Sequence, residues 1–279
     1  MKTGRVRGRQ ALGGILHALG LKRPRPAALS VLMYHGVTAD SLNDAGQQSL
    51  SASQFDGHMA FLRDSGVEIL PLEEGVVRVA TPGWSGHAVS VVFDDGYAGV
   101  HDHALEALVR YRIPATLFLA TQWIGQPDFP WAPASLGRPL SWPEVATLIK
   151  DGGCSIGSHT HSHRVLTALD SPTVRDELRR SRAAIEHHLG ITSRTFAYPY
   201  GSYGTFDIRT RRIVSEEGFS VACTTVWGRH RRRDDPLAVK RIRMSWCDSN
   251  LEIAKTLAGC YDWYRFVQRL QARHRQLPA

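Results

Sequence analysis

The sequence contains little cysteine and no long apolar run, and both absences limit what the chain can be. Its cysteines are widely spaced and form no Cys-x-x-Cys pair; they are Cys154, Cys223, Cys247 and Cys260. Such spacing gives no sign of a zinc knuckle or a disulfide framework, and it fits a reducing compartment at least as well as an oxidising one. No segment stays apolar over the roughly 20 residues that a membrane-spanning helix needs. The sequence also shows no internal repeat and no interdomain linker, so we expect a single folded domain.

Acidic residues are missing from the first 27 positions, although the whole chain contains 26 of them. Residues 1–27 hold seven basic residues, so the rest of the chain accounts for only about +1 of the net charge of +8. Leu12, Ile15, Leu16 and Leu19 fall at helical spacing, which predicts a short interfacial helix. Glycines and a histidine dilute this run, so it is a poor secretory signal. We interpret 1–27 as a basic leader that either packs loosely on the domain or contacts an anionic membrane surface. We therefore expect a protein that is cytoplasmic or peripheral at the inner membrane, with export as the alternative.

From residue 28 onward, short apolar runs alternate with amphipathic stretches, a pattern typical of β–α units. The pattern predicts strands over residues 28–34, 67–70, 88–93, 115–120, 154–157, 195–197, 219–224 and 238–244. It predicts helices over residues 53–63, 72–80, 97–111, 141–150, 172–189, 206–217 and 250–273. The span 122–140 is rich in Pro, Gly and Trp and is predicted to be a long loop. We therefore expect one barrel-like parallel α/β domain over 28–249, with a C-terminal helix in 250–279 packed on it.

Three polar motifs follow predicted strands, and the carboxyl ends of strands are where α/β barrels place their catalytic groups. Asp94 and Asp95 follow the strand 88–93. Three histidines follow the strand 154–157, and imidazole suits zinc and related ions. His159 and His163 share a face if they lie on a helical turn, and His161 then points elsewhere. Pro199-Tyr200-Gly201 follows the next strand as a turn. Each motif alone has a simpler explanation: the two aspartates as turn carboxylates, the histidines as exposed loop residues, and Pro199-Tyr200-Gly201 as an aromatic turn that packs on the core. The occurrence of all three in this order, each after a strand, favours a catalytic site.

In this order, Phe93-Asp94-Asp95-Gly96, His159-Thr160-x-x-His163 and Pro199-Tyr200-Gly201 resemble the motifs of the polysaccharide deacetylases, which share the NodB-type chitooligosaccharide deacetylase domain (carbohydrate esterase family 4). The resemblance covers residues 29–245. It implies a distorted (β/α) barrel of about seven parallel strands and one divalent metal, most often zinc, with cobalt, nickel and manganese as alternatives. By position, it implies that Asp94 is the general base and that the metal ligands are Asp95, His159 and His163. It also implies that the backbone N–H of Tyr200 stabilises an oxyanion.

Two features depart from the commoner family pattern. The usual acid is a late histidine, but residues 239–271 contain none. His35 instead ends the first predicted strand, which resembles the circularly permuted branch that includes the biofilm poly-β-1,6-N-acetylglucosamine deacetylases. This resemblance implies that His35 is the general acid. The second departure is Ala197, which occupies the position of an arginine that steadies the catalytic aspartate. What tunes the pKa of Asp94 is therefore left open.

Aromatic residues supply the remaining site predictions. We assign Pro199, Trp131 and Trp227 to substrate binding, because aromatic rings stack on sugars and Pro199 shapes the motif turn. Trp227 has an equally good alternative as a core residue. The basic run 229–233 is interpreted as a solvated loop, and no nucleic-acid partner is expected.

Together these features predict a metal-dependent hydrolase that removes N-acetyl groups from N-acetylglucosamine-type residues of a polysaccharide, such as a biofilm exopolysaccharide, or of its lipid-linked precursor. One alternative is another metal-dependent C–N amide hydrolase, acting on peptidoglycan or a small amide. A second is a non-catalytic carbohydrate-binding assembly protein that has kept the fold.

Overall fold

The computed structural model describes residues 27–39, 49–245 and 248–276, with the side chains of 273–276 left out. Except for Ala27, the predicted basic leader lies outside these residues, and so does its contact with a membrane. Among the described helices, none combines the length and the apolar character needed to cross a bilayer.

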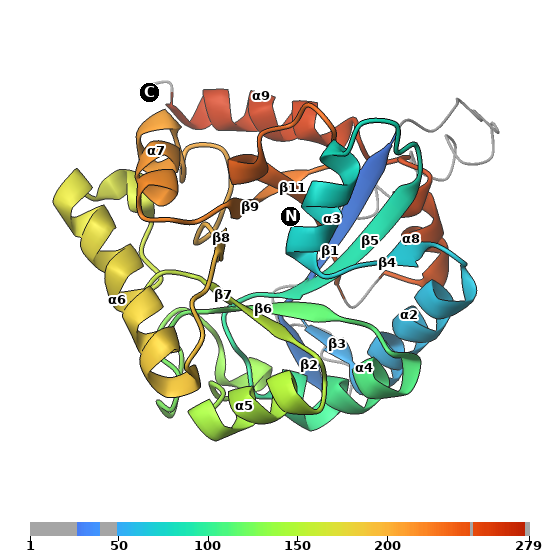
Figure 1. Ribbon diagram of the computed structural model, residues 1–279, viewed down its shortest axis with the longest axis horizontal. Coiled ribbons are helices and arrows are strands. Elements are labelled where there is room, and N and C mark those ends of the chain that lie inside the picture. The colour runs from blue at the N-terminus through green and yellow to red at the C-terminus, as the bar shows by residue number, and fades with distance from the viewer. Residues whose placement is uncertain (1–26, 40–48, 246–247, 277–279) are drawn as a thin grey trace.

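Seven parallel strands form a closed barrel, which confirms the predicted fold class (Figure 1). In spatial order around the ring they are β1 (Ala28–Tyr34), β11 (Val239–Arg243), β9 (Val221–Trp227), β8 (Thr195–Ala197), β7 (Ser155–Ser158), β6 (Ala115–Leu119) and β5 (His87–Phe93). The ring closes because β1 pairs on both of its edges, with β5 from Ala28↔His87 to Tyr34↔Phe93 and with β11 at Leu32↔Ile242. All seven residues of β1 are buried, as expected for a strand covered on both faces.

Short strands lie beside this barrel. β4 (Glu68–Ile69) extends the sheet next to β5, and β10 (His230–Arg231) pairs antiparallel with β1. β2 (Gly36–Thr38) and β3 (Ser49–Ser51) form a separate parallel pair directly after the end of β1.

Helices surround the barrel in Figure 1. They are α2 (Ala52–Asp64), α3 (Leu72–Ala80), α4 (Leu105–Tyr111), α5 (Trp142–Lys150), α6 (Ser171–Leu189), α7 (Ile208–Glu216), α8 (Asn250–Leu257) and α9 (Tyr264–Gln276). Short 3₁₀ turns cover Ala134–Leu136, Leu166–Ala168 and Pro236–Ala238. Apolar faces of the helices pack on the outer surface of the barrel in the main core cluster, where Phe55 and Met59 of α2 meet Tyr34 and Phe93.

Side chains that cap the helix N-termini explain where several helices begin. Ser141 and Glu144 form a capping box at the start of α5, the helix predicted over 141–150. The first helix begins earlier than predicted, because Ser51 and Gln54 form its capping box and Ser53 lies within the helix. The helix predicted over 97–111 also differs: it starts with a π-helical turn, Val100–Ala104, and continues as α4.

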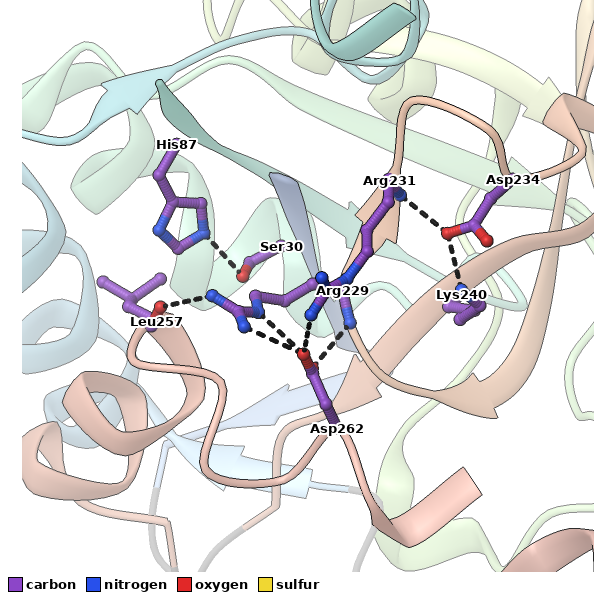
Figure 2. Close-up of polar contacts among 8 residues, drawn as sticks. All are labelled: Ser30, His87, Arg229, Arg231, Asp234, Lys240, Leu257 and Asp262. Carbon is purple, nitrogen blue, oxygen red and sulfur yellow. Dashed lines mark hydrogen bonds and ion pairs between the residues drawn. The ribbon is translucent and has the colours of Figure 1, made fainter. Parts of the chain in front are cut away.

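The single helix predicted over 250–273 is two helices, α8 and α9. The break is at Gly259, which has φ +78°, a conformation that glycine adopts without steric cost. A side chain there would collide with the guanidinium of Arg229. Figure 2 shows why Arg229 occupies that space: its guanidinium and its backbone N–H donate to the carboxylate of Asp262, and it also donates to the carbonyl of Leu257. The chain therefore turns around Arg229 instead of continuing as a helix.

Candidate active site

The ends of β5 and β7 bring the two predicted acidic and imidazole motifs together. After β5 ends at Phe93, the chain turns sharply: Asp95 has φ +72° and the Gly96 N–H donates to the Asp94 carbonyl at 2.9 Å. A side chain at Gly96 would meet Ile124 and Leu119, so the turn also needs glycine for space. Both carboxylates are buried, and they point to different partners.

Asp95, His159 and His163 form a compact buried triad. The carboxylate Oδ1 of Asp95 lies 3.4 Å from Nε2 of His159 and 3.3 Å from Nε2 of His163. The three candidate ligand atoms all lie within 4.8 Å of one another. Ligands held about 2.0–2.1 Å from a tetrahedral zinc ion are about 3.3 Å apart, and two imidazoles with one carboxylate are a common catalytic donor set. The residues present therefore fit a divalent metal.

The loop that follows β7 sets the positions of the two histidines, and it is not the helical turn that the sequence spacing allowed. Thr160 and His163 have φ +65° and +64°, and the His163 N–H donates to the Thr160 hydroxyl at 2.9 Å. Glu177 of α6 accepts from the backbone N–H of both His161 and Ser162. The His161 ring turns away from the triad to a hydrogen bond with Thr121, at 3.0 Å.

Electrostatics inside the triad follow from burial and charge. Burial on its own would raise the pKa of Asp95, but hydrogen bonds from His159 and His163 hold that pKa well below its usual value. Burial would lower the pKa of His159, and the carboxylates of Asp95 and Asp94 more than reverse this, so the pKa is raised. The Nδ1 of His159 bonds the Ala197 carbonyl at 2.7 Å, which leaves Nε2 facing Asp95.

Asp94 is paired with Arg241 of β11, a residue that the sequence analysis missed. The guanidinium binds the carboxylate in a two-pronged pair, at 2.6 Å to Oδ1 and 2.8 Å to Oδ2, and its Nε donates to the Thr224 carbonyl. Burial would raise the pKa of Asp94, but Arg241 foremost, with His159 and His35, brings that pKa below its usual value. Arg241 therefore provides the positive charge that is absent at Ala197.

His35 directly follows β1 and lies in the same buried charge cluster. Burial lowers its pKa, while the negative charges of Asp95 and Asp94 oppose that shift. Its side chain is 7% exposed, and its Nδ1 makes no hydrogen bond to a described residue. The acid predicted from the sequence is thus in electrostatic contact with the predicted base.

The turn after β8 carries Pro199, which is buried, and Tyr200, whose side chain is 50% exposed. Tyr200 has φ +62° and its ring centroid lies 5.0 Å from that of His163. Its backbone N–H donates to no described residue. The oxyanion-donor and substrate roles of these two residues remain predictions.

The two tryptophans assigned to substrate binding occupy different surroundings. Trp131 stacks on the His163 ring, with the centroids 4.0 Å apart and the planes at 20°. Trp227 is 6% exposed and packs edge-on against Tyr264 of α9, with centroids 5.4 Å apart. Trp227 thus has the core position that the sequence left as its alternative.

Strained backbone concentrates at this site. Among the described residues, five that are not glycine have a positive φ, and four of them belong to the three motifs: Asp95, Thr160, His163 and Tyr200. Each such conformation costs about 1–3 kcal/mol and persists where the surroundings impose it, most often at functional sites. This clustering of positive φ angles indicates a functional site, and the indication does not depend on which residue types are present.

A second group of potential ligands, His101, Asp102 and Glu144, lies on the surface. Both carboxylate oxygens of Glu144 already accept from Arg138, and one also accepts from the Ser141 cap. The group is explained by helix capping and ion pairing.

Comparisons with known proteins agree with this geometry. Residues 84–222 match the family model described as Polysaccharide deacetylase. YxkH of Bacillus subtilis is 26% identical over 226 residues, which cover 81% of this chain and 74% of YxkH. The poly-beta-1,6-N-acetyl-D-glucosamine N-deacetylase of Staphylococcus aureus is 26% identical over 162 residues, 55% of this chain and 54% of that protein.

Among solved structures, IcaB from Ammonifex degensii superimposes with a TM-score of 0.69 at 26% identity, covering 84% of this chain and 98% of IcaB. The family match contains Asp94, Asp95, His159, His163 and Tyr200, whereas His35 and Arg241 lie outside it. The closed parallel barrel, the three motifs at its strand ends and these matches lead to one assignment: the chain belongs to the polysaccharide deacetylase family.

Proposed function

We propose that this protein is a metal-dependent hydrolase that removes N-acetyl groups from N-acetylglucosamine-type residues of a polysaccharide or of its lipid-linked precursor. The observation that carries the proposal is the buried triad of Asp95, His159 and His163 beside the Asp94–Arg241 pair. The Staphylococcus aureus relative is named for the same reaction on poly-β-1,6-N-acetyl-D-glucosamine, and this chain aligns with about half of its length. The likeness supports the substrate class and leaves the individual polymer to experiment.

Hydrolysis of an acetamide needs an activated water, a stabilised oxyanion and a proton for the departing amine. A divalent metal held by Asp95, His159 and His163 would supply Lewis-acid polarisation of the carbonyl and of water. Asp94, whose lowered pKa keeps it ionised at neutral pH, would accept the proton of the attacking water. Arg241 would hold that carboxylate in one orientation through its two hydrogen bonds.

The remaining roles fall to residues on the other strand ends. As the C–N bond breaks, the amine nitrogen must gain a proton, and His35 is the buried imidazole that would donate it. The backbone N–H of Tyr200 would donate a hydrogen bond to the oxyanion, a contribution typically of about 3–4 kcal/mol. Acetate and a free amino sugar are then the products.

The test is acetate release from N-acetylglucosamine oligomers by the purified protein loaded with zinc or cobalt, beside Asp94→Asn. We expect release by the wild type, loss of release in Asp94→Asn with metal still bound, and loss of bound metal in Asp95→Ala. No release from the wild type on β-1,4- and β-1,6-linked oligomers and on lipid-linked substrate, with metal bound, would refute the proposed substrate class. Metal retained at unchanged stoichiometry in Asp95→Ala would refute the ligand assignment.

A further inference from the structure

The two histidines of the triad are oriented in different ways. His159 is fixed by the hydrogen bond between its Nδ1 and the Ala197 carbonyl, at 2.7 Å. The Nδ1 of His163 is buried and makes no hydrogen bond to any described residue. The ring of His163 is instead covered by the ring of Trp131, with centroids 4.0 Å apart and planes at 20°. Ring stacking therefore restrains the orientation of His163, as the hydrogen bond to the Ala197 carbonyl restrains that of His159.

Orientation matters because an imidazole binds a metal through one nitrogen lone pair, in the plane of the ring. Ligating histidines usually donate their second ring N–H to an acceptor, and that contact fixes the ring and is worth about 10–100-fold in metal affinity. A stacked indole restricts ring rotation by packing. It also presents an electron-rich face to an imidazole that becomes electron-poor when it binds a cation. The contact thus favours the metal-bound form.

Trp131 is itself held in place by the loop 122–140. Its ring packs against Phe129, with centroids 4.9 Å apart, and meets the edge of Trp123. Phe129 in turn packs edge-on against Tyr97, two residues beyond Asp95, with centroids 4.8 Å apart. Aromatic contacts therefore connect the Asp94–Asp95 turn to His163 through this loop.

Backbone hydrogen bonds anchor the same loop at both ends. The Leu140 N–H donates to the Gly96 carbonyl at 2.8 Å, and the Gln122 N–H donates to the His161 carbonyl at 2.9 Å. One end is thus bonded to the turn that carries Asp95, and the other to the segment that carries His159 and His163. Trp131 therefore lies in a loop whose two ends are hydrogen-bonded to the two ligand-bearing segments, and its position is fixed relative to both.

We propose that Trp131 is a positioning residue that orients His163 for metal binding through ring stacking. The inference rests on the proposed metal site at Asp95, His159 and His163, and it gives Trp131 a function that does not need a sugar. If Trp131 only stacked on a sugar ring of the substrate, its loss would change substrate binding and leave the metal affinity unaffected.

The test measures metal binding without glycan, by zinc competition with a chromophoric chelator and by the visible absorption of the cobalt-substituted protein. We expect Trp131→Leu to bind zinc about tenfold more weakly and to show an altered cobalt spectrum. Trp131→Phe, which keeps an aromatic face, should recover most of the affinity. Trp131→Met fills similar volume without a ring, and it replaces the leucine variant in the comparison if that variant does not fold.

A matched control comes from the other tryptophan–histidine stack, Trp142 on His188 in α5 and α6, with centroids 4.3 Å apart and planes at 12°. Trp142→Leu should leave zinc affinity unchanged. Wild-type affinity in Trp131→Leu or Trp131→Met, or equal losses in the methionine and phenylalanine variants, would overturn the inference while leaving the metal site intact. A wild-type protein that binds no zinc or cobalt would overturn the metal site itself, and the inference with it.

Discussion

Asp94 and its buried cationic partner Arg241 come from the two strands that flank β1, because Arg241 lies on β11 and Asp94 follows the end of β5. Arginine suits this position better than lysine, since its planar fork bonds both carboxylate oxygens at once. Both side chains are almost completely buried. The pair therefore fixes the orientation and the charge of the proposed base together.

Arg241→Lys keeps a positive charge but loses the two-pronged geometry. We expect kcat to fall about 100-fold, because small misplacements of a reacting group have effects of this size, while zinc binding stays close to that of the wild type. Steady-state kinetics and metal titration on the same preparations provide the measurement. Arg229→Lys, which alters a buried arginine–aspartate pair away from the site, is the control and should lower stability with kcat retained. Wild-type kcat in Arg241→Lys would contradict the role of Arg241.

His35→Gln tests the proposed acid. Glutamine keeps a polar side chain of similar size but cannot supply a proton, and general acids contribute about 10²–10⁴-fold. We expect a loss of at least about 100-fold in kcat on an N-acetyl substrate, with metal content unchanged. An activated ester, whose leaving group needs no proton, should be hydrolysed with a much smaller loss. Equal losses on both substrates would argue against His35 as the acid.

Among individual residues, the sequence predicted well those that follow a strand within a recognisable motif. Asp95, His159 and His163 meet as expected, with Asp94 in electrostatic contact with His159, because the carboxyl ends of parallel strands lie at the same end of the barrel. Arg241 was not found, because its partner is 147 positions away and nothing local requires the pairing. The alternation along β11, which places Arg241 on the same side as Val239, was the available signal.

Among the elements, the C-terminal pair α8 and α9 shows how one polar contact can decide the course of the chain. Asp262, in the connection between them, accepts hydrogen bonds from Arg229, which lies between β9 and β10, and from Arg231 of β10 (Figure 2). The hydrogen bonds from Arg229 and Arg231 bring the pKa of Asp262 below its usual value, although burial acts in the opposite direction. The apolar periodicity of 250–273 contained no sign of this contact, so the sequence predicted one helix.

Asp262→Ala should destabilise the fold, because it leaves the guanidinium of Arg229 buried without its counter-charge. Breaking a buried pair from one side costs about 3–5 kcal/mol, and we expect a loss near the lower figure, because Arg231 is partly exposed. Urea denaturation measures the free energy of unfolding. Asp176→Ala, which removes the exposed Asp176–Arg180 pair, should change it by less than about 1 kcal/mol. Equal effects of the two changes would show that the Asp262 contacts do not anchor α8 and α9.

For the whole molecule, buried histidines make stability depend on pH. Burial lowers the pKa of His35 and His58, and it lowers the pKa of His230 from 6.5 to about 4. The unfolded chain therefore binds protons near pH 6.5 that the folded chain binds only at lower pH. This contribution to stability is fully present above pH 6.5, is lost as the pH falls toward about 4, and changes by about 1.4 kcal/mol per pH unit for each proton.

His230→Gln removes one of these groups far from the proposed metal site. Between pH 6.5 and 4.5 we expect its free energy of unfolding to fall less steeply than that of the wild type, by up to one proton equivalent. Urea denaturation at half-unit pH steps gives both slopes. Identical slopes would mean that His230 is protonated equally in the folded and unfolded chains.

The closure of the barrel by β1 has a consequence for the order in which the protein can assemble during its synthesis. β1 and β5 are both complete once residue 93 has been made, but the second edge of β1, which pairs with β10 and β11, is not filled until β11 ends at residue 243. At about 5–20 residues per second, this interval is on the order of ten seconds. Throughout this interval, a strand that is completely buried in the finished barrel has an open edge that can recruit strands from other chains. Release of the chain before β11 is made should therefore yield aggregates and not a smaller soluble barrel.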